Sequence, residues 1–234
     1  MTPALEFRAV VKSFREGSAT RTVLCGVDAQ VQPGEVIVLL GPSGSGKSTI
    51  VNLAAGLDVP ESGMVLVAGQ DLAGCTERQR TLLRRRRIGL VFQGYNLIPE
   101  LSVHDNVALR GALDGVPARQ TGTAVRALLA EVGLAGRGHE FPDHLSGGEQ
   151  QRVAVAAALC HQPELVLADE PTGALDIATA AQIVELLVRL TRGRGGALVF
   201  VTHNPEYLRI ADQVWRLDAG RLITEAGADQ AAPP

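Results

Sequence analysis

The chain has 234 residues, of which 46% are hydrophobic and 20% are charged. This composition is close to globular averages and excludes a chain that is disordered over most of its length. The formal net charge of −3 excludes a global field that would recruit nucleic acid or anionic lipid. No apolar run approaches the roughly 18 to 20 residues that a membrane span needs, so we expect a folded protein that does not cross a bilayer.

The basic residues are unevenly divided, because 20 are arginine and only two, Lys12 and Lys47, are lysine. Lys12 is expected at the surface. The run Arg84–Arg87 is expected to be a solvated face, the alternative being a contact with lipid headgroups or with a partner's cytoplasmic helices. Three cysteines are scattered along the chain: Cys25, Cys75 and Cys160. Their number and spacing favour buried small hydrophobes over disulfides or a zinc site.

In chain order, the first half of the sequence predicts strands with one helix among them. Segments 5–11, 23–31 and 64–68 have the pattern of antiparallel strands separated by turn residues. The runs 36–40 and 88–92 are apolar throughout, which is typical of strands covered on both faces. A helix is expected directly after residue 47.

The second half begins with a mostly helical stretch from about residue 96 to residue 163, which predicts a helical insertion in an α/β core. Helices are expected over 103–113, 123–132, 146–160 and 177–191, and apolar strands over 164–168 and 197–201. One face of the last helix carries Ala180, Val184, Leu187 and Leu190 and should pack on the sheet. The tail from Ala226 has no apolar pattern and is expected to be disordered.

Residues 41–49, GPSGSGKST, fit the phosphate-loop pattern G-x-x-x-x-G-K-[ST] between an expected strand and an expected helix. Glycines at 41, 44 and 46 let backbone N–H groups converge on phosphate oxygens. Lys47 supplies an ammonium between the β- and γ-phosphates, and the Ser48 hydroxyl can ligate Mg²⁺. The residues expected to hold the nucleotide are Gly41, Pro42, Ser43, Gly44, Ser45, Gly46, Lys47, Ser48 and Thr49.

An acidic pair, Asp169 and Glu170, ends the expected strand in ELVLADE. Mg²⁺ sheds its water reluctantly, so Asp169 is expected to hold it through water. Glu170 is then free to take a proton from the water that attacks the γ-phosphate. The pair alone would fit a solvated strand end equally well, and its pairing with the phosphate loop favours the metal site.

A second glycine motif, HLSGGEQQR, spans residues 144–152. Ser146 and Glu149 form a capping box that begins a helix near Gly147. A capped helix is the simplest interpretation, yet Gly147 and Gly148 cost about 0.8 to 1 kcal/mol each relative to alanine in a first turn. We therefore expect the glycines to leave the helix N-terminus bare for an anion.

Together these motifs resemble ATP-binding-cassette (ABC) ATPases, over about residues 4–225. LSGGEQ resembles the family's signature, and four further elements follow the family order: Phe14, Gln93 in VFQ, Asp176 in GALD and His203 in VTHN. The resemblance implies an α/β P-loop NTPase with a RecA-like core, an N-terminal antiparallel β-subdomain and an inserted helical subdomain. It implies one domain over 1–225, with the core at about 1–93 and 163–225, the helical part at about 94–162, and a tail at 226–234.

The resemblance also implies roles for single residues and a second copy of the chain. Phe14 would stack on adenine, Gln93 would touch Mg²⁺ and the attacking water, and His203 would contact the γ-phosphate. Two cassettes would bind head to tail around two ATP molecules. The residues that each copy would then offer to its partner's nucleotide are Ser146, Gly147, Gly148, Glu149 and Asp176.

Within the family, VFQGYNLIPELSVHDNVAL and DEPTGALD resemble the lipoprotein-releasing, macrolide-export and cell-division ATPases. This implies the ATP-hydrolysing subunit of a bacterial ABC transporter, which dimerises on ATP and drives a separate integral membrane permease. It would lie in the cytoplasm, peripherally on the inner face of the cell membrane, with no nucleic acid partner. The alternatives are a regulatory, mechanotransmitting ATPase of a cell-division or cell-wall complex and, third, a soluble ABC ATPase without a transport role.

Replacement of Lys47 by arginine tests the phosphate loop. A phosphate loop accommodates a compact ammonium and not a broad planar guanidinium, so Lys47→Arg should weaken ATP binding although the charge is kept. Nucleotide titration of the variant beside the wild-type chain measures the effect. Unchanged affinity would contradict the assignment of Lys47.

Overall fold

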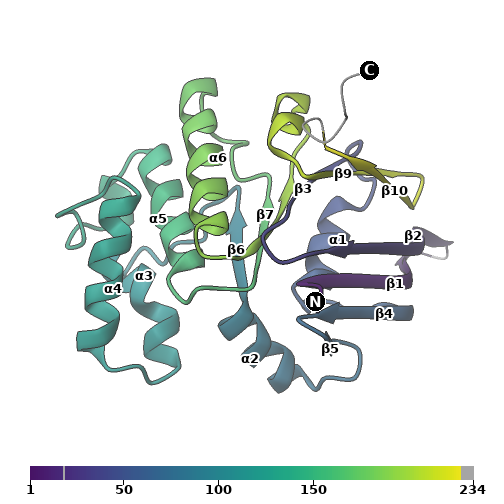
Figure 1. Ribbon diagram of the computed structural model, residues 1–234, viewed down its shortest axis with the longest axis horizontal. Helices are drawn as coiled ribbons and strands as arrows, with labels where there is room; N and C mark the ends of the chain where they lie inside the picture. Colours follow the sequence, from purple (N-terminus) through teal and green to yellow (C-terminus); the bar gives the residue numbers. More distant parts are fainter. Residues whose placement is uncertain (18, 228–234) are drawn as a thin grey trace.

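The computed structural model describes residues 1–17 and 19–227, and within these ranges the strands form two sheets (Figure 1). In the smaller sheet each adjacent pair of strands is antiparallel. The order is β2 (Ala19–Val31), β1 (Leu5–Glu16), β4 (Ser62–Val67) and β5 (Gln70–Asp71). The larger sheet has the order β10 (Arg221–Ala226), β9 (Gln213–Asp218), β3 (Val36–Leu40), β8 (Ala197–Val201), β7 (Leu165–Asp169) and β6 (Ile88–Phe92).

Five strands of the larger sheet run parallel, from β9 through to β6, and β10 pairs antiparallel to β9. The register sets Asp169 at the end of β7 opposite Val201 at the end of β8, and opposite Phe92 at the end of β6. The carboxyl ends of these strands therefore meet at one edge of the sheet, where ligands of open α/β sheets usually bind.

The helices lie on both sides of the larger sheet. Figure 1 shows α3, α4 and α5 grouped at one end of the molecule, far from the smaller sheet, while α1 lies between the two sheets. The helices have these bounds: α1 Lys47–Ala54, α2 Glu77–Arg87, α3 Val103–Leu113, α4 Ala118–Glu131, α5 Gly147–Leu159 and α6 Ile177–Arg192, with short 3₁₀ turns η1 Pro142–His144 and η2 Pro205–Ile210. Within the described ranges, none of these helices is long and apolar enough to span a membrane.

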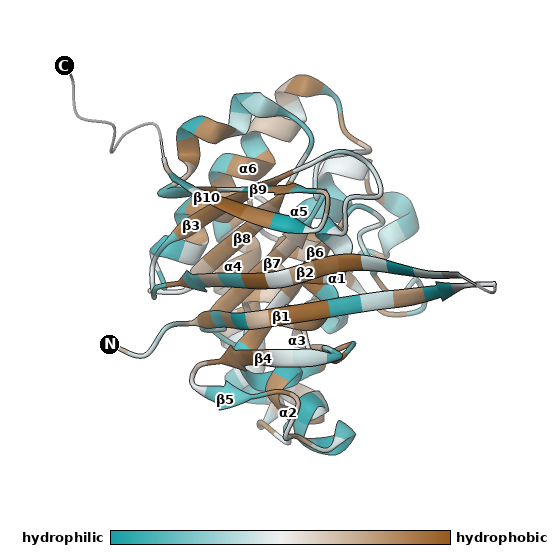
Figure 2. Ribbon diagram, turned by 90° about the vertical axis from the view of Figure 1, so that its right-hand side faces the viewer, coloured by the Kyte–Doolittle hydropathy of each residue, from teal (hydrophilic) through white to brown (hydrophobic). Residues whose placement is uncertain are grey.

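Two hydrophobic cores share the larger sheet. Along β3, the side chains of Val36, Val38 and Leu40 belong to a core with the helices α3 to α6. Those of Ile37 and Leu39 belong to a second core with α1 and the smaller sheet. Both faces of the strand are buried, which explains the uniformly apolar sequence, and Figure 2 shows the same predominantly hydrophobic character in β3, β7 and β8.

The apolar strands and the helix faces predicted from the sequence are confirmed. The structure has strands at Val36–Leu40, Ile88–Phe92 and Ala197–Val201, and buries the expected face of α6. Helix α4 begins at Ala118 rather than at residue 123, because Pro117 can precede a first turn. Helix α2 was missed, as were β5, β9 and β10. Ala226, expected in the disordered tail, is the last residue of β10, and residues 228–234 of that tail lie outside the described residues.

Two expectations about single side chains are wrong. Lys12 is not a free surface residue, because its side chain is 12% exposed and its Nζ lies 2.7 Å from Asp58 Oδ1 and 2.9 Å from the Val59 carbonyl oxygen. Cys25, on β2, is exposed rather than buried, whereas its neighbour Leu24 on the same strand is fully buried. All three cysteines are free, and Cys75 and Cys160 are partly buried.

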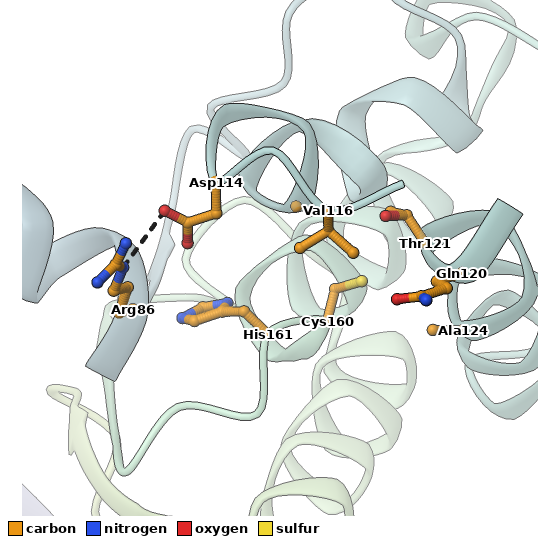
Figure 3. A pocket seen from close by; sticks show the side chains of 9 residues that line it. Arg86, Asp114, Val116, Gln120, Thr121, Ala124, Cys160 and His161 are labelled. Atoms are coloured by element: carbon orange, nitrogen blue, oxygen red, sulfur yellow. Dashed lines mark hydrogen bonds and ion pairs between the residues drawn. The ribbon is translucent and has the colours of Figure 1, made fainter. Parts of the chain in front are cut away.

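The run Arg84–Arg87 is also not a simple solvated face, because it forms the last turn of α2 and joins other elements by ion pairs. Arg84 pairs with Glu77 of the same helix at 2.7 Å, whereas Arg87 pairs with Glu164, just before β7, at 3.0 Å. Arg85 and Arg86 both reach Asp114 at the end of α3, at 2.8 and 3.4 Å, and Figure 3 shows the Arg86 contact. The last turn of α2 is thus tied to α3 and to the segment before β7.

His161 lies beside this junction, next to a pocket of about 400 Å³ (Figure 3). Its Nε2 lies 3.2 Å from the Ile88 carbonyl oxygen and 3.1 Å from an Arg110 guanidinium nitrogen. Burial, followed by the Arg110 charge, lowers the pKa of His161 from 6.5 to about 4. The ring is therefore neutral at pH 7.

This shift predicts a pH-dependent stability. Between pH 6.5 and about 4 the unfolded chain binds a proton at His161 that the folded chain does not. The free energy of unfolding should therefore fall as the pH drops through this window, by up to about 3 kcal/mol. Denaturant unfolding of the wild-type chain and of His161→Gln at several pH values measures it. The variant should lose less stability over the window, and equal losses would contradict the assignment.

Candidate functional site

The phosphate loop connects β3 to α1, and two of its glycines have neighbours that exclude a side chain. A Cβ at Gly41 would lie 2.4 Å from the Leu217 carbonyl oxygen, and one at Gly46 would lie 2.5 Å from Val23 Cγ1. Gly46 also has a φ of 107° at the N-cap of α1, in the left-handed region that favours glycine. The loop can keep this path only with glycine at both positions.

Lys47 begins α1 and points back over the loop. Its Nζ donates to the carbonyl oxygens of Gly41 at 2.7 Å and Pro42 at 2.9 Å, and the residue is only 8% exposed. The ammonium is therefore held inside the curve of the loop, next to the N-terminus of α1. A helix N-terminus and a fixed ammonium together favour an anion at this place.

A cavity of about 370 Å³ opens in front of the loop. It brings together Phe14 of β1, the loop and Glu170, which are far apart in the sequence. The residues that line it are Phe14, Arg21, Val23, Ser43, Gly44, Gly46, Lys47, Ser48, Thr49 and Glu170. Gly41 and Pro42 support the loop through their carbonyl groups, and Ser45 Oγ is buried with no hydrogen-bond partner among the described residues. A nucleotide-sized ligand therefore has an aromatic ring at one part of the cavity and a cationic loop at another.

Arg21 and Val23 line this cavity but were not predicted. Both lie on β2, and the β1–β2 register pairs Arg21 with Phe14. An Arg21 guanidinium nitrogen donates to the Gly44 carbonyl oxygen at 2.9 Å, so the hairpin and the phosphate loop are in direct contact. Phe14 is 41% exposed and carries the Lys12 ammonium 5.2 Å from its ring centroid. The hairpin register, which follows from the turn near residue 17, is the signal that could have placed Arg21 beside Phe14.

Asp169 ends β7 beside the loop. Burial raises the pKa of its carboxyl, while the Ser48 hydroxyl and the Lys47 ammonium act in the opposite direction. In the part of the chain that the structure describes, no cluster of three or more His, Cys, Asp or Glu side chains could hold a metal ion by itself. One carboxylate and one hydroxyl fit Mg²⁺, which usually takes one or two protein oxygens and completes its shell with water and phosphate.

Glu170 and His203 form a direct pair at the same edge of the sheet. His203 Nδ1 lies 3.3 Å from Glu170 Oε2, and the Glu170 side chain is less exposed than that of His203. The backbone N–H of Glu170 donates to the Val201 carbonyl oxygen at 3.1 Å, although its φ of 46° lies in the left-handed region. A strained backbone held by its neighbours is common at functional sites.

Gln93 follows β6 directly and is exposed at this edge. Its side chain packs against Gly173, where an added Cβ would lie 2.8 Å from the Gln93 amide nitrogen. Because Phe92 pairs with Asp169 in the sheet, Gln93 leaves β6 next to the acidic pair. Gln93, Asp169, Glu170 and His203 thus all follow or end neighbouring parallel strands.

The signature segment has the predicted capping box. Ser146 caps α5, its Oγ accepts from the Glu149 N–H, and the Glu149 carboxylate accepts from the Ser146 N–H at 2.8 Å. Arg137 pairs with both Glu140 and Glu149. Asp176 likewise caps α6 by accepting from the Thr179 N–H at 3.0 Å. None of these residues lines the cavity of the phosphate loop within the described chain.

The two glycines at the start of α5 have close neighbours within the chain, while the opening of this helix N-terminus to an anion stays a prediction. A Cβ at Gly147 would lie 2.7 Å from the Tyr95 hydroxyl oxygen, and one at Gly148 would lie 2.6 Å from Thr179 Cγ2. The two glycines therefore have close neighbours within their own chain. Their presence is explained by this packing as well as by any ligand.

Comparisons with known proteins identify the family of the chain. A profile of the family described as ABC transporter matches residues 24–173. An uncharacterized ABC transporter ATP-binding protein of Mycobacterium tuberculosis is 48% identical over 94% of this chain and 89% of its own length. The lipoprotein-releasing system ATP-binding protein LolD of Ruegeria pomeroyi is 45% identical over 96% of this chain and 99% of its own length. The macrolide export ATP-binding/permease protein MacB of Sodalis glossinidius is 40% identical over the whole chain, which covers 36% of MacB.

A solved structure, the dimeric post-hydrolysis state of the ATP-binding cassette MJ0796 bound to ADP and Pi, matches with a TM-score of 0.85 and 34% identity. The match covers 95% of this chain and 98% of the other. The fold predicted from the motifs, that of an ABC ATPase, is thereby confirmed. With a matching profile over more than half of the residues and relatives above 40% identity, this chain belongs to the ABC transporter family.

Proposed function

We propose that the chain binds Mg²⁺ and ATP in the phosphate-loop cavity, hydrolyses ATP, and drives a separate membrane permease as a pair of copies. The observation that carries this proposal is that the phosphate loop and Glu170 line one cavity, with Asp169 beside Ser48 and His203 beside Glu170. The chain's relatives include ATP-binding proteins of a lipoprotein-releasing system and of macrolide export.

Each residue of the site has a physical reason for its proposed role. Lys47 and the N-terminus of α1 hold the β- and γ-phosphates, because both present positive charge inside the loop. Phe14 offers an exposed ring on which adenine can stack. Ser48, Asp169 and Gln93 are the oxygen ligands that would hold Mg²⁺, which when bound neutralises charge on the phosphates.

The chemical step is assigned to Glu170, with His203 as its neighbour. Glu170 takes a proton from the attacking water, a general-base contribution of about 10² to 10⁴ in rate. His203 lies 3.3 Å from the Glu170 carboxylate and contacts the γ-phosphate, so that base and phosphate keep a fixed geometry. Glu170 lines the cavity in front of the loop, where the attacking water would enter.

The site is proposed to be completed by a second copy of the chain. Ser146, Gly147, Gly148, Glu149 and Asp176 do not line the cavity of their own copy, and their helix N-terminus favours an anion. The matched cassette MJ0796 is a dimer. In this arrangement ATP joins two copies, and removal of the γ-phosphate releases them.

We assign the core to about residues 1–93 and 163–225 and the helical subdomain to about 94–162. The permease would bind from the membrane side and hold the chain at the inner face of the cell membrane. A regulatory cassette that moves a cell-wall or cell-division complex without transport would use the same site. Copurification with tagged chain identifies the membrane partner, and substrate flux in reconstituted vesicles separates a pump from a regulator.

The general base is tested by Glu170→Gln. The amide cannot take a proton but keeps the shape, so turnover should fall by about 10² or more while ATP binding remains. ATP-bound dimers should then accumulate, which size exclusion with ATP detects. The matched control is Glu185→Gln on the exposed face of α6, which should turn over normally. Normal turnover of Glu170→Gln would refute the assignment of the base.

The unpredicted Arg21 gives a second test. Its guanidinium lines the cavity and contacts the loop at Gly44, so Arg21→Ala should weaken the affinity for ATP, by about tenfold for the loss of one charge-assisted hydrogen bond. Arg15→Ala, on the same hairpin but outside the cavity lining, is the control. Titration with ATP at two salt concentrations measures both. Equal affinities of the two variants would exclude a contact between Arg21 and the nucleotide.

A further inference from the structure

Three glycines near the site each lie directly against a side chain from another segment of the chain. Gly173 faces Gln93, Gly147 faces Tyr95, and Gly148 faces Thr179. In each case an added Cβ would lie between 2.6 and 2.8 Å from the facing side chain, closer than real Cβ contacts. The segment after β6, the start of α5 and the start of α6 therefore interlock through these three contacts.

The contact between Tyr95 and Gly147 is the one that joins the Gln93 segment to the signature. Tyr95 lies two residues after Gln93, and its hydroxyl reaches the first residue of α5. A Cβ at Gly147 would lie 2.7 Å from the hydroxyl oxygen but 3.7 Å from the ring carbon that carries it. Only the hydroxyl makes the approach close, because 3.7 Å is an ordinary van der Waals distance.

The backbone at Tyr95 is held in a costly conformation. Its φ is 59° and that of Asn96 is 53°, so two successive residues other than glycine lie in the left-handed region. Asparagine visits this region readily, whereas a tyrosine there is strained. Such strain persists only where surrounding contacts fix the residue, and it is common at switch segments.

A second link ties the same two segments together. The fully buried Gln151, one turn along α5, donates from its amide nitrogen to the Phe92 carbonyl oxygen at 3.3 Å. The start of α5 is thus fixed to the end of β6 on one side of Gln93 and to Tyr95 on the other. A displacement of the Gln93 segment would be transmitted to the first turn of α5.

We infer that Tyr95 is a positioning residue that sets the first turn of α5 against the Gln93 segment through the contact of its hydroxyl with Gly147. This rests on the proposed function, in which Gln93 serves the chain's own nucleotide and α5 serves the nucleotide of the second copy. Tyr95 then links the two ATP sites of the pair through a single side chain. It touches neither nucleotide itself.

Four chains test the inference: wild type, Tyr95→Phe, Gly147→Ala and the double variant, each assayed for ATP turnover against ATP concentration. Tyr95→Phe keeps the ring and should lower kcat by less than tenfold with KM unchanged. Gly147→Ala should lower kcat further, because its methyl group meets the hydroxyl. The double variant should turn over about tenfold faster than Gly147→Ala, since removal of the hydroxyl leaves room for the methyl group.

The matched control uses Gly148→Ala, whose added Cβ meets Thr179 and not Tyr95. Tyr95→Phe should not rescue Gly148→Ala, whereas Thr179→Ser, which lacks the Cγ2 atom, should. If the methyl group at position 147 acted only by blocking the second copy's phosphate, Tyr95→Phe would not rescue Gly147→Ala either. Absence of rescue would therefore overturn the inference, and so would equal rescue of both glycine variants.

The free energies of unfolding of the same four chains, measured without nucleotide, keep this test separate from the proposed function. A wild-type chain without ATP turnover would refute the proposed function and leave the contact to be judged by these unfolding data. Non-additive effects of Tyr95→Phe and Gly147→Ala support the contact, and additive effects overturn it. If Gly147→Ala alone fails to fold, recovery of folded protein in the double variant is the expected rescue.

Discussion

The register of the parallel strands is the constraint on which the rest of the site depends. The strands β6, β7 and β8 pair so that Phe92, Asp169 and Val201 lie in line. Everything that follows these strands therefore begins at one edge of the sheet. The Glu170 N–H extends the pairing by one more hydrogen bond, to Val201, although its φ has already left the strand region. The acidic pair owes its position to the sheet and not to its own short loop.

The site contains charged groups whose burial is electrostatically unfavourable in the folded chain. Burial raises the pKa of Asp169, which means that the ionised carboxylate is less stable in the folded chain than in water. The Lys47 ammonium donates its hydrogen bonds to loop carbonyl groups. A ligand that brings negative charge to the loop and a cation to Asp169 would satisfy both. Unfavourably buried charges of this kind are typical of binding and catalytic sites, where function rather than stability is optimised.

The sequence was sufficient for what depends on local pattern. Uniform apolar runs predicted the central strands, and Ser146 with Glu149 predicted the start of α5. Helix α2 was missed because Leu83 is its only buried residue, so it has almost no apolar periodicity. Arg21, Lys12 and the Tyr95–Gly147 contact were missed for another reason. Each depends on which distant segment lies opposite, and a single sequence does not show register or tertiary neighbours.

The alternation of β3 between two cores also bears on how such a chain can evolve. Val36, Val38 and Leu40 serve the helical side, while Ile37 and Leu39 serve the side of the smaller sheet. Insertion of a single residue in β3 would send each set to the opposite core, and would rotate the phosphate loop away from the acidic pair. Insertions and deletions can therefore accumulate only in the connections between strands and helices. Substitutions in one core must remain compatible with the other, because both pack on β3. The length and register of β3 therefore fix the packing of both cores at once.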